Sequence, residues 1–208
     1  MDYRYIDMAH YPRKEHFAYF TGLTYPYVGL TANIDITQFL EKSKTEKWPF
    51  FLSVCYCVSQ AANGIPEFRQ RILDGKIIEF SRCQTSHTVA LDDGTYGYCT
   101  LDSNMPFPAF LPYAQQAQAE AKQKGSIQEE EVLNKFFIST LPWVSYTALV
   151  QPVPCPADSN PRITWGKTFP QGSQILLPVS VLCHHGLVDG THIGAFYRRL
   201  SQEMARLA

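Results

Sequence analysis

The sequence has no excess of charge of either sign and no long apolar run. Its 18 lysine and arginine residues face 19 aspartate and glutamate residues, which leaves a formal net charge of -1. A chain without a basic excess gives no support to binding of nucleic acid or of an anionic membrane surface. The most apolar stretch, residues 49–58, is too short to cross a bilayer. We therefore expect neither a nucleic-acid partner nor a membrane partner.

The six cysteines form no regular pattern, and the sequence contains no CxxC motif. Nothing in their spacing therefore predicts a disulfide framework or a cysteine-ligated zinc site. The first sixteen residues also lack the apolar core of a signal peptide. We expect free thiols, a cytoplasmic location and no metal centre.

The 12 glycines form neither a GxGxxG motif nor a Walker pattern, so no nucleotide-phosphate loop is predicted. Low-complexity tracts, charge blocks and internal repeats are also missing. What the chain does have is a composition of 45% hydrophobic and 13% aromatic residues over a length of 208. This composition supports a sizeable core, and we expect a single domain spanning residues 1–208.

Apolar periodicity and turn signals predict a mixture of helices and strands. Helices are predicted at 13–20, 38–47, 49–62, 109–124 (ended by Gly125) and 193–207. Strands are predicted at 28–34, 85–91, 96–101, 135–140, 144–150, 162–167 and 175–183, with a hairpin turn at Asp74-Gly75. Because strands and helices alternate without a strict βαβ rhythm, we expect an α/β two-layer sandwich of a large mixed β-sheet with helices.

The segment "VLCHHGLVDGTH", residues 181–192, carries the strongest chemical signal. Adjacent side chains on a strand point to opposite faces, so a zinc site using both His184 and His185 is disfavoured. If the strand stops near Cys183, one histidine turns inward and the other faces a cleft. Asp189 precedes the last predicted helix, where an aspartate is favoured by capping and by the helix dipole. His192 is expected to be structural or solvent-facing.

The residues His184-His185-Gly186-Leu187-Val188-Asp189-Gly190 are similar to the HHxxxDG signature of the chloramphenicol acetyltransferase family. The catalytic cores of dihydrolipoamide acyltransferases share this signature. Further segments resemble the family in the same order along the whole chain: "YPRKEHFAYF", "LTANIDIT", "ISTLPWVSYTAL", "PRITWGK" and "QGSQILLPVSV". The resemblance implies the fold of the CoA-dependent acyltransferases.

The resemblance also implies a reaction, which is transfer of an acetyl group from acetyl-CoA to a hydroxyl without an acyl-enzyme. His185 would be the general base, because an imidazole titrates near neutral pH and can take a proton from an alcohol. Asp189 would form an ion pair with Arg13. Without the resemblance, Arg13 would be interpreted as a surface charge on the first predicted helix. Ser139 would donate a hydrogen bond to the oxyanion, and Thr164 would hold an ordered water near it.

Substrate-binding positions follow from the same resemblance. Those expected to line the acceptor pocket are Phe20, Thr88 and Phe137. Phe20 and Phe137 stand where tyrosine and asparagine are common in the family, which leaves the natural acceptor open. Those expected to contact acetyl-CoA are Trp143, Lys167 and Trp48, each of which reads equally well as core or surface.

The resemblance implies a homotrimer in which His185 of one subunit faces an acceptor pocket built largely by its neighbour. The leading interpretation is an acetyl-CoA-dependent O-acetyltransferase acting on chloramphenicol, with antibiotic resistance as the consequence, or on a related hydroxyl compound. One alternative is an acyltransferase fed by a lipoyl arm, which is disfavoured because the chain has no lipoyl domain or Pro/Ala linker. Two others are a trimeric small-molecule-binding protein without turnover and, more distantly, a metal-dependent hydrolase.

Overall fold

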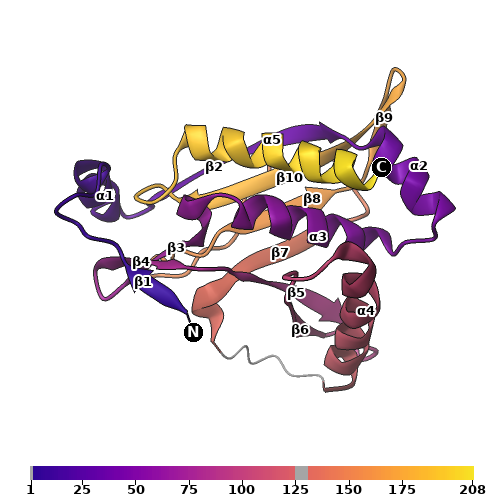
Figure 1. Ribbon diagram of the computed structural model, residues 1–208, viewed down its shortest axis with the longest axis horizontal. Helices are drawn as coiled ribbons and strands as arrows, with labels where there is room; N and C mark the ends of the chain where they lie inside the picture. Colours follow the sequence, from indigo (N-terminus) through magenta and orange to yellow (C-terminus); the bar gives the residue numbers. More distant parts are fainter. Residues whose placement is uncertain (1, 125–130) are drawn as a thin grey trace.

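The computed structural model describes residues 2–124 and 131–208, and it has two layers (Figure 1). One layer is a large β-sheet, and the other is a set of helices that cover one face of it. The helices are α1 Lys14–Thr21, α2 Thr37–Thr45, α3 Phe50–Asn63, α4 Phe107–Lys124 and α5 Gly190–Leu207, with short 3-10 turns at Pro66–Arg69 and Val132–Asn134. The strands are β1 Tyr3–Tyr5, β2 Tyr27–Asp35, β3 Gln70–Leu73, β4 Lys76–Phe80, β5 Gln84–Ala90, β6 Tyr96–Leu101, β7 Lys135–Leu141, β8 Arg162–Gly166, β9 Phe169–Gln171 and β10 Gln174–His184.

The large sheet has the strand order β2-β10-β8-β7-β5-β6, with β9 paired to β10. Strand β7 is parallel to both of its neighbours, β5 and β8, whereas the other pairs are antiparallel. A second, smaller sheet has the order β1-β4-β3. The predicted α/β sandwich with a large mixed sheet is therefore confirmed.

The core lies between the large sheet and the helices. Helix α3 begins directly after Pro49 and is buried along most of its length, as expected for its continuous apolar sequence. Helix α5 is amphipathic, and its buried positions are those predicted from the periodicity: Ile193, Phe196, Leu200 and Met204, with Leu207 partly buried. The predicted hairpin turn is also present, because Asp74 and Gly75 both adopt positive φ between β3 and β4.

One predicted strand is wrong. Residues 144–150 include valine, tyrosine and threonine, which favour strands, but the chain leaves the sheet at Leu141 and runs through an irregular segment. Both Val144 and Val150 are exposed, so the apolar positions of this segment do not face the core of the same chain. Strands β1 and β9, which are three residues long each, were not predicted. Helix α4 begins at Phe107, two residues before its predicted start, and Gly125 lies outside the described residues.

Candidate active site

The two histidines of the motif occupy different environments at the end of β10. His184 is the last residue of the strand, pairs with Tyr27 of β2 and is buried. Its Nδ1 accepts a hydrogen bond of 3.1 Å from the backbone N–H of Gly186. Burial lowers the pKa of His184 to about 4, with a smaller opposing contribution from Asp158. His184 is therefore the inward-facing, neutral member of the pair.

His185 follows the strand and is only half-buried. Its backbone N–H donates to the Pro26 carbonyl at 2.7 Å, and its Nδ1 lies 3.0 Å from the Val188 carbonyl oxygen. A carbonyl can only accept, so this contact assigns the ring proton to Nδ1 and leaves the lone pair on Nε2. The Phe20 ring stacks on the imidazole, with centroids 3.7 Å apart and planes inclined by 18°. The backbone and Phe20 thus hold this imidazole in the tautomer and orientation that a base requires.

Asp189 connects the motif to the start of the chain. It is the N-cap of α5, and its Oδ1 accepts hydrogen bonds from the backbone N–H groups of Thr191 (2.9 Å) and His192 (3.4 Å). Its Oδ2 forms an ion pair with Arg13, whose Nη2 also lies 3.5 Å from the His185 carbonyl oxygen. Burial acts to raise the pKa of Asp189, but hydrogen bonds from Thr191, the charge of His192 and Arg13 together hold that pKa well below its usual range.

His192 has a structural role, as expected from the sequence. Its Nδ1 accepts the Asp189 backbone N–H at 3.1 Å, which completes a reciprocal capping box at the start of α5. Its Nε2 lies 3.6 Å from Glu67. This side chain therefore helps to fix the geometry of Asp189.

Replacing Asp189 by asparagine is expected to lower both catalytic activity and thermal stability. Asparagine caps a helix as well as aspartate does, but it leaves Arg13 without its charged partner. Asp189→Ala removes the cap as well and is expected to cost about 1 kcal/mol more, which is about 2–4 °C in Tm for a chain of this size. The measurements are Tm and kcat/KM for both variants. An unchanged Tm in both would contradict the structural role given to the ion pair.

Two buried histidines predict a pH-dependent stability. Burial lowers the pKa of His87, as of His184, to about 4, whereas an unfolded histidine titrates near 6.5. Between these values the unfolded chain binds more protons than the folded chain, so the free energy of unfolding falls as the pH is lowered from about 6.5 to 4. The test is Tm against pH. A His87→Asn, His184→Asn variant should lose most of that slope, whereas His16→Asn, at an exposed position on α1, should keep it.

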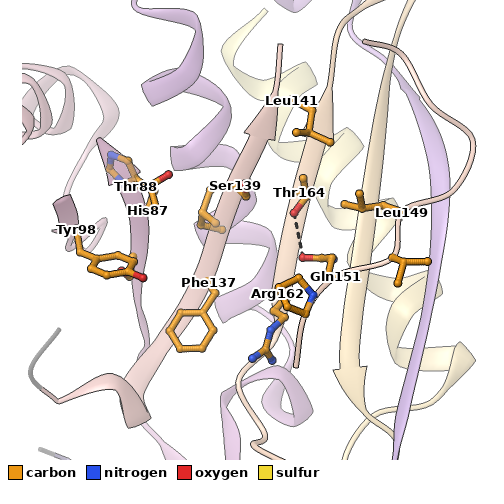
Figure 2. A pocket seen from close by; sticks show the side chains of 14 residues that line it. His87, Thr88, Tyr98, Phe137, Ser139, Leu141, Leu149, Gln151, Arg162 and Thr164 are labelled. Carbon is orange, nitrogen blue, oxygen red and sulfur yellow. Dashed lines mark hydrogen bonds between the residues drawn. The ribbon is translucent and has the colours of Figure 1, made fainter. Parts of the chain in front are cut away.

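A second group of predicted residues lines a cavity of about 460 Å³ on the sheet (Figure 2). Ser139 on β7 and Thr164 on β8 are neighbours in register, while Ile138 and Ile163 beside them belong to the core. Because side chains alternate along strands, the two hydroxyls lie on the face opposite the helices. Thr164 Oγ1 donates to Gln151 Oε1 at 3.2 Å. The structure also places Thr88 and Phe137 in this cavity.

The predicted residues thus form two separate groups within one chain. The first group is His185, Asp189, Arg13 and Phe20, and the second is Ser139, Thr164, Thr88 and Phe137. Thr164 pairs with Ser180, and His185 lies five residues after Ser180, just past the end of β10. At about 3.3 Å per residue and about 4.8 Å per strand, His185 and Ser139 are roughly 15–20 Å apart. Neither side chain is long enough to bridge that gap.

Of the three residues predicted to contact acetyl-CoA, Trp143 and Lys167 lie on neighbouring segments, whereas Trp48 lies elsewhere. Trp143 is 81% exposed on the turn after β7, and Lys167 is exposed just after β8. The two segments are joined by a hydrogen bond of 2.9 Å from the Lys167 backbone N–H to the Val144 carbonyl. A groove of about 410 Å³ beside them is lined by Pro142, Lys167 and Thr168, among others. Trp48 instead packs edge-on against Phe107 of α4, with centroids 4.8 Å apart.

Sequence reasoning missed most of the other residues that line the cavity, among them His87, Tyr98, Gln151 and Arg162. Arg162 is held by two hydrogen bonds of 2.8 Å to the carboxylate of Asp158, four residues earlier. The signal for this pair is the Asp-x-x-x-Arg spacing, but the spacing does not say that the arginine lies in a cavity. That follows from the register of β8 against β7.

Within residues 2–124 and 131–208, no cluster of three or more histidine, cysteine, aspartate or glutamate side chains is arranged to hold a metal ion. Over the same ranges, no helix is both long and apolar enough to cross a membrane. The six cysteines are free thiols, and all except Cys155 are buried.

Comparison with known proteins relates the site to a family. The model of the family "Chloramphenicol acetyltransferase" matches residues 1–201. A chloramphenicol acetyltransferase of Klebsiella sp is 29% identical over 205 residues, which cover 96% of this chain and 93% of that protein. Chloramphenicol acetyltransferase 3 of Escherichia coli is 27% identical over 206 residues, which cover 97% of this chain and 97% of that protein.

Solved structures show the same fold. A chloramphenicol acetyltransferase structure superposes with a TM-score of 0.83 at 22% identity, covering 97% of this chain and 99% of that one. A truncated catalytic core of the 2-oxoacid dehydrogenase multienzyme complex from Thermoplasma acidophilum gives a TM-score of 0.67 at 14% identity, with coverage of 97% and 98%. The chain belongs to the chloramphenicol acetyltransferase family and is an acyltransferase.

Proposed function

We propose that this protein transfers the acetyl group of acetyl-CoA directly to a hydroxyl of chloramphenicol or of a related small molecule. The observation that carries the proposal is the imidazole of His185, whose Nδ1 proton is held by the Val188 carbonyl. This contact leaves Nε2 free to take a proton from an acceptor hydroxyl. The family membership supplies the reaction class, and the names of the relatives supply the acceptor.

In the proposed reaction, Nε2 of His185 removes the proton of the acceptor hydroxyl as its oxygen attacks the thioester carbonyl. Ser139 donates a hydrogen bond to the oxyanion that forms, and Thr164 holds a water beside it. When the carbon–sulfur bond breaks, His185 returns the proton to the departing thiolate. Asp189 and Arg13 have a structural role in this reaction. Their ion pair keeps the loop after β10 in place, and neither group transfers a proton.

The complete site forms between subunits of a homotrimer in this proposal. His185 of one subunit faces the cavity that contains Ser139 in the next, because the two residues are too far apart within one chain. Exposed apolar side chains near the cavity support an interface there. Val150, which lines the cavity, is 95% exposed, and Leu30, which lies beside the cavity residues Leu149 and Gln151, is also exposed.

For acetyl-CoA, the proposal uses the exposed indole of Trp143 and the ammonium group of Lys167 beside the groove at the end of β7. An aromatic face suits stacking with the adenine, and a lysine suits a phosphate. Trp48 packs against Phe107, and the proposal assigns it no direct contact with acetyl-CoA. The buried free thiols agree with a cytoplasmic location.

The acceptor is tested by measuring thiol release from acetyl-CoA with and without chloramphenicol. Release that depends on chloramphenicol and persists in EDTA supports the proposal as stated. Release with other hydroxyl compounds but not with chloramphenicol would keep the reaction and replace the acceptor. No release with any member of a broad hydroxyl panel, despite ligand binding, would favour the binding-protein interpretation.

A further inference from the structure

The floor of the cavity consists of two rows of side chains across the strands. Ser139 and Thr164 form one row, and Phe137 and Arg162, each two residues earlier on the same strands, form the other. Side chains two residues apart on a strand share a face, so both rows point into the cavity, about 7 Å apart. The first row carries Ser139, the proposed oxyanion donor, and Thr164, which is proposed to hold a water beside the oxyanion. The second row has no part in the proposed reaction.

Arg162 is fixed firmly in the second row. Its Nη1 and Nη2 donate to the two carboxylate oxygens of Asp158 at 2.8 Å each, and Nη1 also lies 3.2 Å from the Asn160 carbonyl. The guanidinium carbon is 5.3 Å from the centroid of the Phe137 ring. Tyr27 holds Asp158 in turn, through a hydrogen bond of 3.0 Å from its hydroxyl to Oδ1. A guanidinium carries five N–H donors, so these contacts leave the Nε hydrogen and one Nη2 hydrogen without an acceptor among the described residues.

The other end of the second row carries a polar group without a hydrogen-bond partner within residues 2–124 and 131–208, the hydroxyl of Ser86. Ser86 on β5 is in register with Phe137, lines the cavity and is buried. Its hydroxyl has no hydrogen-bond partner among the described residues. Burial of a hydroxyl without a partner is unfavourable, so the site is one where a ligand oxygen gains a contact. The second row therefore presents an aromatic face between two polar groups.

We propose that Arg162, oriented by Asp158 and assisted by Ser86, makes the enzyme prefer acceptors with a neutral hydrogen-bond-accepting oxygen roughly 7 Å or more from the reacting hydroxyl. This inference rests on the proposed function, because it assumes that the hydroxyl lies over Ser139. The oxygen is neutral because the Asp158 carboxylate already balances the charge of Arg162, so a second carboxylate gains little attraction and meets repulsion. A nitro, sulfonyl or carbonyl oxygen on a planar group lying over Phe137 meets these requirements.

The test uses four acceptors with the amide-diol framework of chloramphenicol and a different group in the para position of the ring: nitro, methylsulfonyl, hydrogen or carboxylate. For the wild type, kcat/KM for the nitro and methylsulfonyl compounds should exceed that for the unsubstituted compound by about ten- to hundredfold. The carboxylate compound should have no such advantage. In Arg162→Leu, the nitro and methylsulfonyl advantage should fall to about one.

Arg162→Lys covers the possibility that the leucine variant does not fold, because lysine keeps a positive charge beside Asp158 but lacks the planar fork. It should lose most of the same advantage. The matched control is Arg206→Leu, which breaks an arginine–glutamate pair on α5 away from the cavity and should leave the preference unchanged. Wild-type kcat/KM values equal across the panel, a best acceptor that carries the carboxylate, or a preference that survives in both Arg162 variants would overturn the inference.

Calorimetric binding of the same four compounds separates this inference from the proposed function. If no compound is acetylated, the acceptor given in the proposed function is wrong, and the binding constants decide the inference on their own. An Arg162-dependent preference in binding would support it, and equal or absent binding would overturn it.

Discussion

Replacing His185 by alanine is expected to lower kcat by about 10²–10⁴-fold, which is the usual contribution of a positioned general base. The residue is half-buried at the end of β10, and its Nδ1 contact with the Val188 carbonyl is its one side-chain hydrogen bond among the described residues. Removal of the ring also loses its stacking on Phe20, worth about 0.5–1.5 kcal/mol, so Tm should fall by only a few degrees and acetyl-CoA binding should stay close to the wild-type value. The measurements are thiol release under saturating substrates, Tm, and acetyl-CoA binding by calorimetry.

His16→Ala is the control for His185→Ala, because His16 is an exposed histidine on the nearby helix α1. It should leave kcat unchanged. Turnover within a factor of about ten of the wild type in His185→Ala would place the base elsewhere. A large fall in Tm, with a fall in kcat no greater than the loss of folded protein explains, would show that His185 acts through the fold and not through proton transfer.

Replacing Ser139 by alanine is expected to lower kcat by about 10²–10³-fold, with KM for the acceptor nearly unchanged. The reason is that a hydrogen bond to the oxyanion is made only as the tetrahedral intermediate forms, so its loss affects kcat and not the binding of the ground state. Ser139 is exposed in the isolated chain, and the variant should keep the wild-type Tm. A rise in KM with unchanged kcat would assign the hydroxyl to acceptor binding instead.

Ser201→Ala serves as the control, because this exposed serine on α5 makes only a local hydrogen bond of 3.1 Å to the Tyr197 carbonyl. It should change neither kcat nor KM. Thr164→Ala should have a smaller effect than Ser139→Ala, since the threonine is proposed to act through a water and its hydroxyl is already engaged with Gln151.

The parts of the fold that could be predicted from the sequence have local causes. The amphipathic period of α5, the apolar run of β10 and the Asp74-Gly75 turn depend on neighbouring residues, and each was located correctly. The strand predicted at 144–150 failed because this segment pairs with no strand among residues 2–124 and 131–208. Val144 and Val150 are exposed, and Val150 lines the cavity, where we propose that another subunit packs. Pairing between strands is not a local property, so β1 and β9 were missed for the same reason.

The candidate site could be predicted only in part. The motif around His185 and the ion pair of Arg13 with Asp189 followed from the family resemblance, and the structure brings these residues together. Arg162 carries no motif, and its place in the cavity depends on the register of β8 against β7. The distance between His185 and Ser139 likewise depends on strand register. The shared site between subunits was implied by the family resemblance alone, and it stays a proposal.

The most direct test of the central claim, an active site shared between His185 of one subunit and Ser139 of its neighbour, is thiol release by mixed trimers. The two variants His185→Ala and Ser139→Ala are co-expressed with different affinity tags, and trimers that carry both tags are isolated. Each mixed trimer then contains one interface where an intact His185 faces an intact Ser139, so acetyl transfer should return to about a third of the wild-type rate. Mixed trimers no more active than the two parent variants would contradict the shared site, and with it the mechanism proposed for this protein.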